Sequence, residues 1–227
     1  MSLTDVSQDK ILDMLTQETS QLGSNNKKEL VALVHHLREK VEALESYKLI
    51  ATRVRILEKN LVSTMQYSRR ENIEIHNIPQ TVADDKLEET CLKVLDEIGC
   101  GKIKSYRVMA CHRLKNRDKT VIRFITRKHA DAALHNRGKL KSIDMKKCGL
   151  PAKHRLYINE SLCRPLEYLH YITRCAFKLK KIFDFNLWKG RLTLQMEEGG
   201  ENFIISHIED LIEFGLASDE DRAKFMD

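Results

Sequence analysis

The sequence has few residues that interrupt regular structure, with three prolines and nine glycines among 227 residues. Lys27 to Ser68 contains neither, so one uninterrupted helix is permitted over that range. No stretch approaches 18 uncharged apolar residues, which argues against a membrane-spanning helix. The first residues also lack a basic region followed by an apolar run. We therefore expect a cytoplasmic or nuclear protein that is not secreted.

Motifs for catalysis and metal binding are lacking too. No G-x-x-x-x-G-K-[ST] phosphate loop, G-x-S-x-G elbow or H-E-x-x-H is present. The six cysteines form no C-x-x-C pair, so we expect reduced thiols that act as small apolar residues. The spacing of Cys148 and His154 does not suit a metal, and Asp84-Asp85 is better explained as a helix cap. We expect no enzymatic activity, cofactor, metal site or small-molecule substrate.

Charge is strongly segregated along the chain. Residues 102–155 hold 17 lysines and arginines against three aspartates, a balance of +14. Residues 72–101 have a balance of −5, with two bases and seven acids, and residues 197–227 one of −8, with two bases and ten acids. A basic segment of this strength attracts polyanions such as nucleic acids. The alternative is a merely solvated surface, which does not explain why the acids gather elsewhere.

Residues 27–68 are predicted to form a long helix of about 60 Å. Its apolar residues follow a heptad seam with one shortened spacing between Leu44 and Ile50, which includes Tyr47. Charged residues flank the seam, as they do in coiled coils. A single amphipathic helix packed on its own domain is the alternative. We expect the following seam residues to mediate self-association: Leu30, Val34, Leu37, Val41, Leu44, Ile50, Val54, Leu57 and Leu61.

From residue 69 the period changes to that of strands and short helices. Strands are predicted at 72–79, 103–114 and 120–126, with a weak fourth strand near 143–146. Helices are predicted from Asp84 or Asp85 to Gly99 and over 128–136. This order is βαββαβ, the arrangement of a ferredoxin-like sandwich.

After Pro151 a smaller unit is predicted. It comprises a strand at 156–159, a helix over 161–183, a hairpin around Lys189-Gly190, a strand at 203–205 and a short helix at 206–214. Trp188 beside the hairpin turn is either a core anchor or a surface on which a base stacks. The acidic residues from Ala217 onward are expected to be frayed.

The βαββαβ order and the basic charge are typical of an RNA recognition motif. The inward positions are apolar, but Glu74, Lys119 and Val121 occupy the outward positions where that motif has stacking aromatics. Affinity would then come from phosphate contacts, and binding would be salt-sensitive and nearly independent of sequence. The candidate nucleic-acid contacts are Arg69, Arg70, His112, Arg113, Lys115, Arg117, Lys119, Arg123, Arg137, Lys139, Lys141, Lys146 and Lys147.

The chain resembles the first-open-reading-frame proteins of non-LTR (LINE-type) retrotransposons over part of its length. The likeness rests on the coiled coil followed by Arg69–Pro79, then Cys111–Leu114 and Thr120–Phe124. The C-terminal stretch is similar to the C-terminal domain of the baculovirus few-polyhedra (FP) protein. That likeness rests on Tyr157–Leu162, Ala176–Lys178, Trp188–Leu192 and Ile208–Leu211.

Together the two resemblances cover about residues 27–214. They imply a coiled-coil homo-oligomer, trimeric in vertebrate retrotransposons, that coats single-stranded nucleic acid and acts as an annealing chaperone. They also imply that Arg69, Arg70, His112, Arg113 and Arg123 are the contacts. The few-polyhedra relatives imply a role in virion or occlusion-body formation instead. Unlike some relatives, the chain has no zinc knuckle.

The sequence thus predicts an α+β protein in five parts. These are a flexible segment or short helix at 1–26, a coiled coil at 27–68, a ferredoxin-like, degenerate RNA-recognition domain at 69–150, an FP-like domain at 151–216 and an acidic tail at 217–227. The expected partners are single-stranded RNA or DNA and further copies of the chain, with no membrane. The alternative is a structural or assembly protein without significant nucleic-acid binding.

Overall fold

The computed structural model describes residues 24–114, 118–152 and 154–225. The chain divides into two units, residues 1–56 and 57–227, which are described separately. The expected segment at 1–23 and the candidate contacts Lys115 and Arg117 lie outside the described residues. Among the described residues, no helix combines the length and apolar character needed to cross a bilayer.

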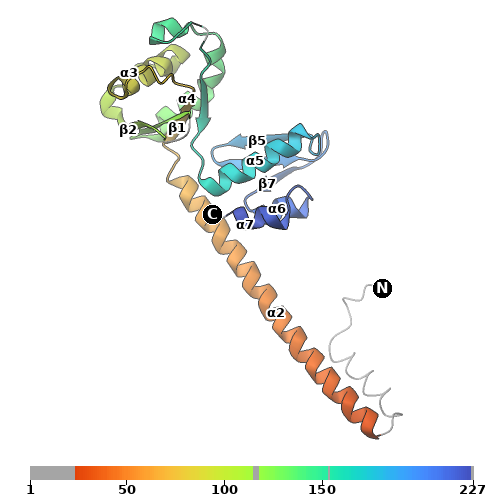
Figure 1. The fold of residues 1–227 in the computed structure, drawn as a ribbon. Helices are drawn as coiled ribbons and strands as arrows, with labels where there is room; N and C mark the ends of the chain where they lie inside the picture. Colours follow the sequence, from red (N-terminus) through yellow and green to blue (C-terminus); the bar gives the residue numbers. More distant parts are fainter. Residues whose placement is uncertain (1–23, 115–117, 153, 226–227) are drawn as a thin grey trace. The chain divides into compact units, whose positions relative to one another are not determined.

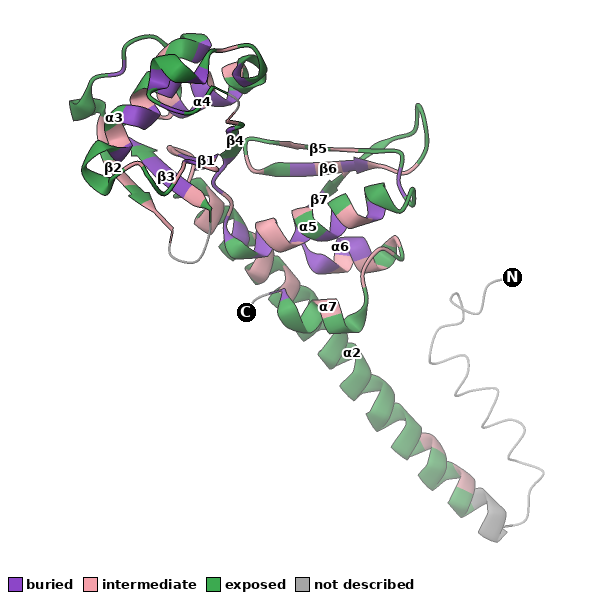
Figure 2. Ribbon diagram, turned by 45° about the horizontal axis from the view of Figure 1, so that its top comes forward, coloured by how far each residue is buried: buried purple, intermediate pink, exposed green. Residues whose placement is uncertain are grey.

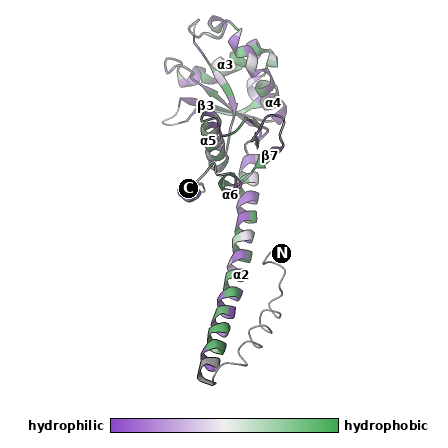
Figure 3. Ribbon diagram, turned by 90° about the vertical axis from the view of Figure 1, so that its right-hand side faces the viewer, coloured by the Kyte–Doolittle hydropathy of each residue, from purple (hydrophilic) through white to green (hydrophobic). Residues whose placement is uncertain are grey.

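Helix α2 (Ser24–Tyr67) forms the described part of the first unit and continues into the second (Figure 1). The prediction of one long helix is confirmed, because no glycine or proline interrupts its hydrogen bonds. Up to Ile56 its large apolar residues are mostly exposed, among them Leu37 (52%), Leu44 (66%) and Ile50 (53%). Figure 3 shows hydrophobic residues recurring along the helix.

The second unit contains a four-stranded antiparallel sheet in the order β2-β3-β1-β4. Its elements follow the chain as β1 (Asn72–His76), α3 (Asp84–Leu95), β2 (Val108–Arg113), β3 (Lys119–Phe124), α4 (Arg127–Asn136) and β4 (Tyr157–Glu160). A π-helical turn (Asp96–Cys100) extends α3, and a 3-10 turn (Ser105–Arg107) precedes β2.

One face of this sheet carries α3 and α4 (Figure 1). The alternation in β1 buries Ile73 and Ile75 on that face, where they pack in one core with Ile122, Phe124 and Ile158. Figure 2 shows the buried residues concentrated between these helices and the strands. The predicted strands and helices of the βαββ part are therefore confirmed, with ends that differ by a few residues.

The predicted strand near 143–146 is wrong. The segment instead forms a 3-10 helix at Met145–Cys148, which Gly149 ends with a φ of 77°. Its buried residues Met145 and Cys148 are three positions apart, a helical spacing, whereas a strand would bury alternate residues. Arg137–Lys141 forms another 3-10 helix just after α4.

The strand predicted to open the C-terminal unit lies in the first sheet. As β4 it pairs antiparallel with β1, with Ile73 opposite Glu160 and Ile75 opposite Ile158. This sheet therefore extends beyond the expected boundary at residue 150. The pairing satisfies the second edge of β1 and buries Ile158 against the helices.

A second antiparallel sheet, ordered β5-β6-β7, consists of Asp184–Trp188, Arg191–Gln195 and Asn202–Ile205. Its core includes Leu192, Leu194 and Ile205, and packs with α5 (Arg164–Lys178), α6 (Ile208–Glu213) and Val62 of α2. Pro165 in the first turn of α5 suits a helix start, because proline has no N–H to leave unpaired there.

The expectation that the acidic residues from Ala217 are frayed is wrong up to residue 225. They form helix α7 (Asp219–Lys224), whose N-terminus is capped reciprocally by Ser218 and Asp221. Tyr168 donates a hydrogen bond to Asp221 at 2.7 Å, and Phe225 is 2% exposed in the core of the second sheet. Burial of this aromatic ring holds the segment in place despite its charge.

Candidate functional site

The candidate contacts that the structure describes do not form one cluster. Arg69 and Arg70 lie at the end of α2, whereas His112 and Arg123 are exposed on β2 and β3. Arg137, Lys139, Lys141, Lys146 and Lys147 are exposed on the two 3-10 helices. The helix that carries Lys146 and Lys147 packs against α3, on the helical side of the sheet.

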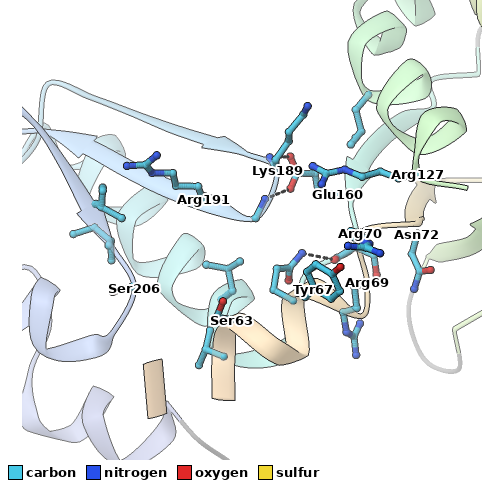
Figure 4. A pocket seen from close by; sticks show the side chains of 18 of the residues that line it. Ser63, Tyr67, Arg69, Arg70, Asn72, Arg127, Glu160, Lys189, Arg191 and Ser206 are labelled. Atoms are coloured by element: carbon cyan, nitrogen blue, oxygen red, sulfur yellow. Dashed lines mark hydrogen bonds between the residues drawn. The ribbon is translucent and has the colours of Figure 1, made fainter. Parts of the chain in front are cut away.

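A cleft of about 300 Å³ lies between the end of α2, helix α4 and the β5–β6 turn (Figure 4). All of its lining residues belong to the second unit. The charged side chains that line it are the bases Lys59, Arg69, Arg70, Arg127, Lys189 and Arg191 and the acids Asp131 and Glu160. We call this the basic cleft.

Two of the cations in the basic cleft are committed to other contacts. Arg69 donates a hydrogen bond to the carbonyl of Leu162 at 3.1 Å, and Lys59 lies 3.0 Å from Asp210. These two side chains therefore help to join α2 to the C-terminal elements. The other four cations, Arg70, Arg127, Lys189 and Arg191, supply the remaining positive charge of the cleft, although Arg70 also donates from Nε to its neighbour Glu71 at 3.0 Å.

Arg127 and Lys189 approach the same carboxylate from different elements. Arg127 Nε is 3.4 Å and Lys189 Nζ 3.6 Å from Asp131 oxygens. Arg191 makes no ion pair with any described residue and is exposed at the start of β6. Two cations sharing one partly exposed carboxylate leave a surplus of positive charge that an anion can neutralise.

Aromatic rings lie beside these cations. The Arg70 guanidinium stacks 3.7 Å from the centroid of the Tyr67 ring, which is 64% exposed. Lys189 Nζ lies 5.8 Å from the ring of Trp188, which is 38% exposed. The sequence left two interpretations of Trp188, a core anchor or a surface on which a base stacks. Trp188 is absent from the core of the second sheet, so its position agrees better with the second interpretation. Exposed aromatic rings near cations are typical of sites that bind single-stranded nucleic acid, where bases stack and phosphates pair with the cations.

Lys119, by contrast, is held within the protein. Its Nζ lies 2.8 Å from Glu167 of α5 and 3.0 Å from Glu74 of β1. The three side chains line a second cleft, of about 530 Å³. Burial opposes the charge on Lys119, but the two carboxylates outweigh it and raise the Lys119 pKa.

Glu74, expected from the sequence to face outward on its strand, is only 6% exposed and offers no open surface. Burial disfavours its ionised form, yet the nearby His76 ring, 3.5 Å away, and the Lys119 ammonium lower the Glu74 pKa overall. The hydroxyl of Ser161 also donates to Glu74, at 3.3 Å. Glu74 and Lys119 thus connect the first sheet to the segment that leads into α5.

Arg113 has a structural role as well. Its guanidinium donates hydrogen bonds of 2.9 Å to the carbonyls of Ile78, Pro79 and Val82. It also lies 3.4 Å from Asp84 at the start of α3. These contacts hold the loop between β1 and α3, and they leave few donors for a ligand.

The candidate list omitted Lys59, Tyr67, Arg127, Lys189 and Arg191. The turn-forming pair Lys189-Gly190 was recognisable in the sequence, and its two positive φ angles of 55° and 72° place the flanking side chains. No sequence signal brings this turn near Arg70 and Arg127, because the three lie in distant segments of the chain.

Comparison of the chain with models of known protein families gives no match, and a search of curated proteins finds no similar sequence.

The roles of Arg113 and Arg123 can be separated by substitution. Arg113→Ala leaves three loop carbonyls without their donor and should lower the free energy of unfolding by about 2–3 kcal/mol. Arg123→Ala removes an exposed side chain and should change it by less than about 0.5 kcal/mol. Urea denaturation of both variants measures the difference. Equal losses of stability would contradict the structural role of Arg113.

The ion network at Glu74 predicts a pH-dependent stability. Because the Glu74 pKa is lowered on folding, its contribution is present at neutral pH and lost as pH falls below the ordinary glutamate pKa of about 4.3. Glu74→Gln should therefore cost about 2 kcal/mol at pH 7 and less at pH 3.5, since the contribution of the carboxylate declines as pH falls from the ordinary pKa towards the lowered folded pKa.

Urea denaturation at both pH values tests this prediction. Glu198→Gln, which removes an exposed carboxylate, is the matched control and should show no such dependence. A cost for Glu74→Gln that stays constant between the two pH values would refute the prediction.

Proposed function

We propose that the protein binds single-stranded nucleic acid, RNA or DNA, through the basic cleft, with low sequence specificity. The observation that carries the proposal is the convergence of Arg70, Arg127, Lys189 and Arg191 around one cleft beside two exposed aromatic rings. Cations neutralise phosphates regardless of base, whereas stacking on an aromatic ring accepts every base. Such a site holds a strand without reading its sequence.

The first sheet supports the same proposal. The order β1-α3-β2-β3-α4-β4 with neighbours β2-β3-β1-β4 agrees with a ferredoxin-like sandwich, as in RNA recognition motifs. We propose that this domain is a degenerate member of that class. Its outward face holds Glu74 in an ion network, so the strand would bind at the edge of the domain, in the basic cleft.

We further propose that α2 forms a homo-oligomeric coiled coil. The exposed seam residues would cost free energy if they stayed in water, at about 25 cal/mol per Å² of apolar surface. Burying them against other copies removes that cost. Several copies held together would bind one strand at several points, which raises the apparent affinity and suits chaperone-like annealing.

These properties accord with the resemblance to retrotransposon first-frame proteins, and we propose a retrotransposon-derived, non-enzymatic role. The exposed seam equally favours a second function, a scaffold that assembles particles through α2 without binding nucleic acid. Binding measurements distinguish the two.

Salt-titrated binding of a labelled single-stranded oligonucleotide to the full chain tests the proposed function. Four phosphate contacts predict a slope of log K against log salt of about −3. Arg70→Gln combined with Arg191→Gln should make that slope shallower by about 1.4, since two contacts are lost.

The matched control is Lys141→Gln combined with Lys146→Gln, which removes the same charge from exposed sites outside the basic cleft. It should leave the slope nearly unchanged. Absence of binding at low salt would favour the scaffold, and equal effects of the two double variants would place binding outside the cleft.

Sedimentation analysis tests the coiled coil. The full chain should form a discrete oligomer, and Leu44→Glu with Ile50→Glu should convert it to a monomer that binds the oligonucleotide at least tenfold more weakly, as expected from lost multivalency. Leu33→Glu with Leu49→Glu, two exposed apolar residues outside the seam, is the control and should remain oligomeric. A monomeric wild-type chain would refute the proposal.

A further inference from the structure

Two carboxylates line the basic cleft, and their surroundings differ. Asp131 is partly exposed and faces the charged ends of Arg127 and Lys189. Glu160, at the end of β4, is 8% exposed. Its two oxygens accept hydrogen bonds from the backbone N–H groups of Lys189 and Gly190, at 2.5 and 2.6 Å. Figure 4 shows these two bonds joining Glu160 to the tip of the hairpin.

The tip of the β5–β6 hairpin is thus bound by an element of the other sheet. With positive φ at both Lys189 and Gly190, successive N–H groups at the turn point the same way and form a small anion-binding concavity. In most hairpins these groups face water. In this protein the Glu160 carboxylate occupies the concavity, and charge-assisted bonds of this kind are the stronger class.

The end of α2 supports the tip from a second direction. A Cβ atom added to Gly190 would lie 2.6 Å from Cγ of Gln66. Gln66 is itself fixed, because its amide donates to the carbonyl of Ser161 at 3.1 Å and accepts from the N–H of Cys163 at 2.9 Å. Only glycine fits between Glu160 and Gln66 at this turn.

We propose that Glu160 is a positioning residue: it holds the hairpin tip so that Lys189 and Arg191 line the basic cleft opposite Arg127. The inference rests on the proposed binding of nucleic acid to this cleft. Glu160 acts through the turn, since both of its oxygens are already hydrogen-bonded to backbone N–H groups. Asp131 has the opposite effect, because it pairs with the cations that a phosphate must reach.

The effect of removing the Glu160 carboxylate on binding should be opposite to the effect expected from its charge alone. Removing any acid from a cationic cleft should strengthen the binding of a polyanion. Asp131→Asn should follow that rule and bind more tightly, with a salt slope no shallower than that of the wild type. Glu160→Gln should instead bind more weakly, because the NH2 group of its amide would face one of the two N–H groups of the turn, donor against donor, and release the tip.

The test is fluorescence anisotropy of the full chain with a 5′-labelled single-stranded oligouridylate, repeated over a series of salt concentrations. Loss of the Lys189 and Arg191 contacts should make the salt slope of Glu160→Gln shallower by about 1.4 and weaken binding on the order of tenfold at 0.15 M salt. A general loss of folded protein would lower the active fraction without changing this slope. A shallower slope therefore indicates that the hairpin tip with Lys189 and Arg191 has moved.

Gly190→Ala is the second variant. It displaces the tip through the contact with Gln66 and leaves the net charge unchanged, so it should reproduce the shallower slope. If Glu160→Gln fails to fold, the salt slope of Gly190→Ala tests whether the position of the hairpin tip controls binding. Tighter binding or an unchanged slope in these variants, with normal wild-type binding, overturns the role of Glu160 alone. Absence of salt-dependent binding by the wild type overturns the proposed function itself.

Discussion

The antiparallel pairing of β4 with β1 is the contact on which the arrangement of residues 57–227 depends. On one side it completes the first sheet and places Ile158 in the core under α3 and α4. At its end it presents Glu160 to the hairpin of the second sheet. The residues that follow, Ser161 and Leu162, accept hydrogen bonds from the end of α2 before α5 begins. One short strand therefore fixes the positions of the elements that form the basic cleft.

Buried acids and exposed bases have different tasks in this unit. Glu74, Glu160 and Asp210 are each less than a tenth exposed, and each accepts several hydrogen bonds or ion pairs. Buried charges of this kind add little net stability over apolar packing, but removing one partner is costly, so they specify geometry. The bases around the cleft are more exposed and less fully paired.

Much of the fold follows from local patterns. The long helix α2, the alternation in β1 and β3 and the turn at Lys189-Gly190 are all predicted correctly, because helical and strand periods and turn residues are local signals. The strand expected near 143–146 and the frayed tail were wrong for a shared reason. Burial of Met145 and of Phe225 depends on partners distant in sequence, which no local pattern contains.

The candidate site was less predictable than the fold. Of the candidate contacts, Arg69 and Arg70 line the cleft, but charge alone could not distinguish a solvated arginine from one that holds a loop, as Arg113 does. It also missed Arg127, although this residue lies in the basic segment 102–155, and Arg191, which lies outside that segment. Long-range pairing of β4 and the hairpin creates the cleft, so its residues become recognisable only in three dimensions.

The location of bound nucleic acid tests the account most directly. Photocross-linking of a single-stranded oligonucleotide that carries 4-thiouridine, followed by mass spectrometry of the cross-linked peptides, would map it on the full chain. Binding in the basic cleft should give cross-links at Tyr67 and Trp188, the two exposed rings beside the cleft cations. Cross-links confined to the face of β2 around Met109 and His112, or to the segment of Lys146 and Lys147, would contradict it.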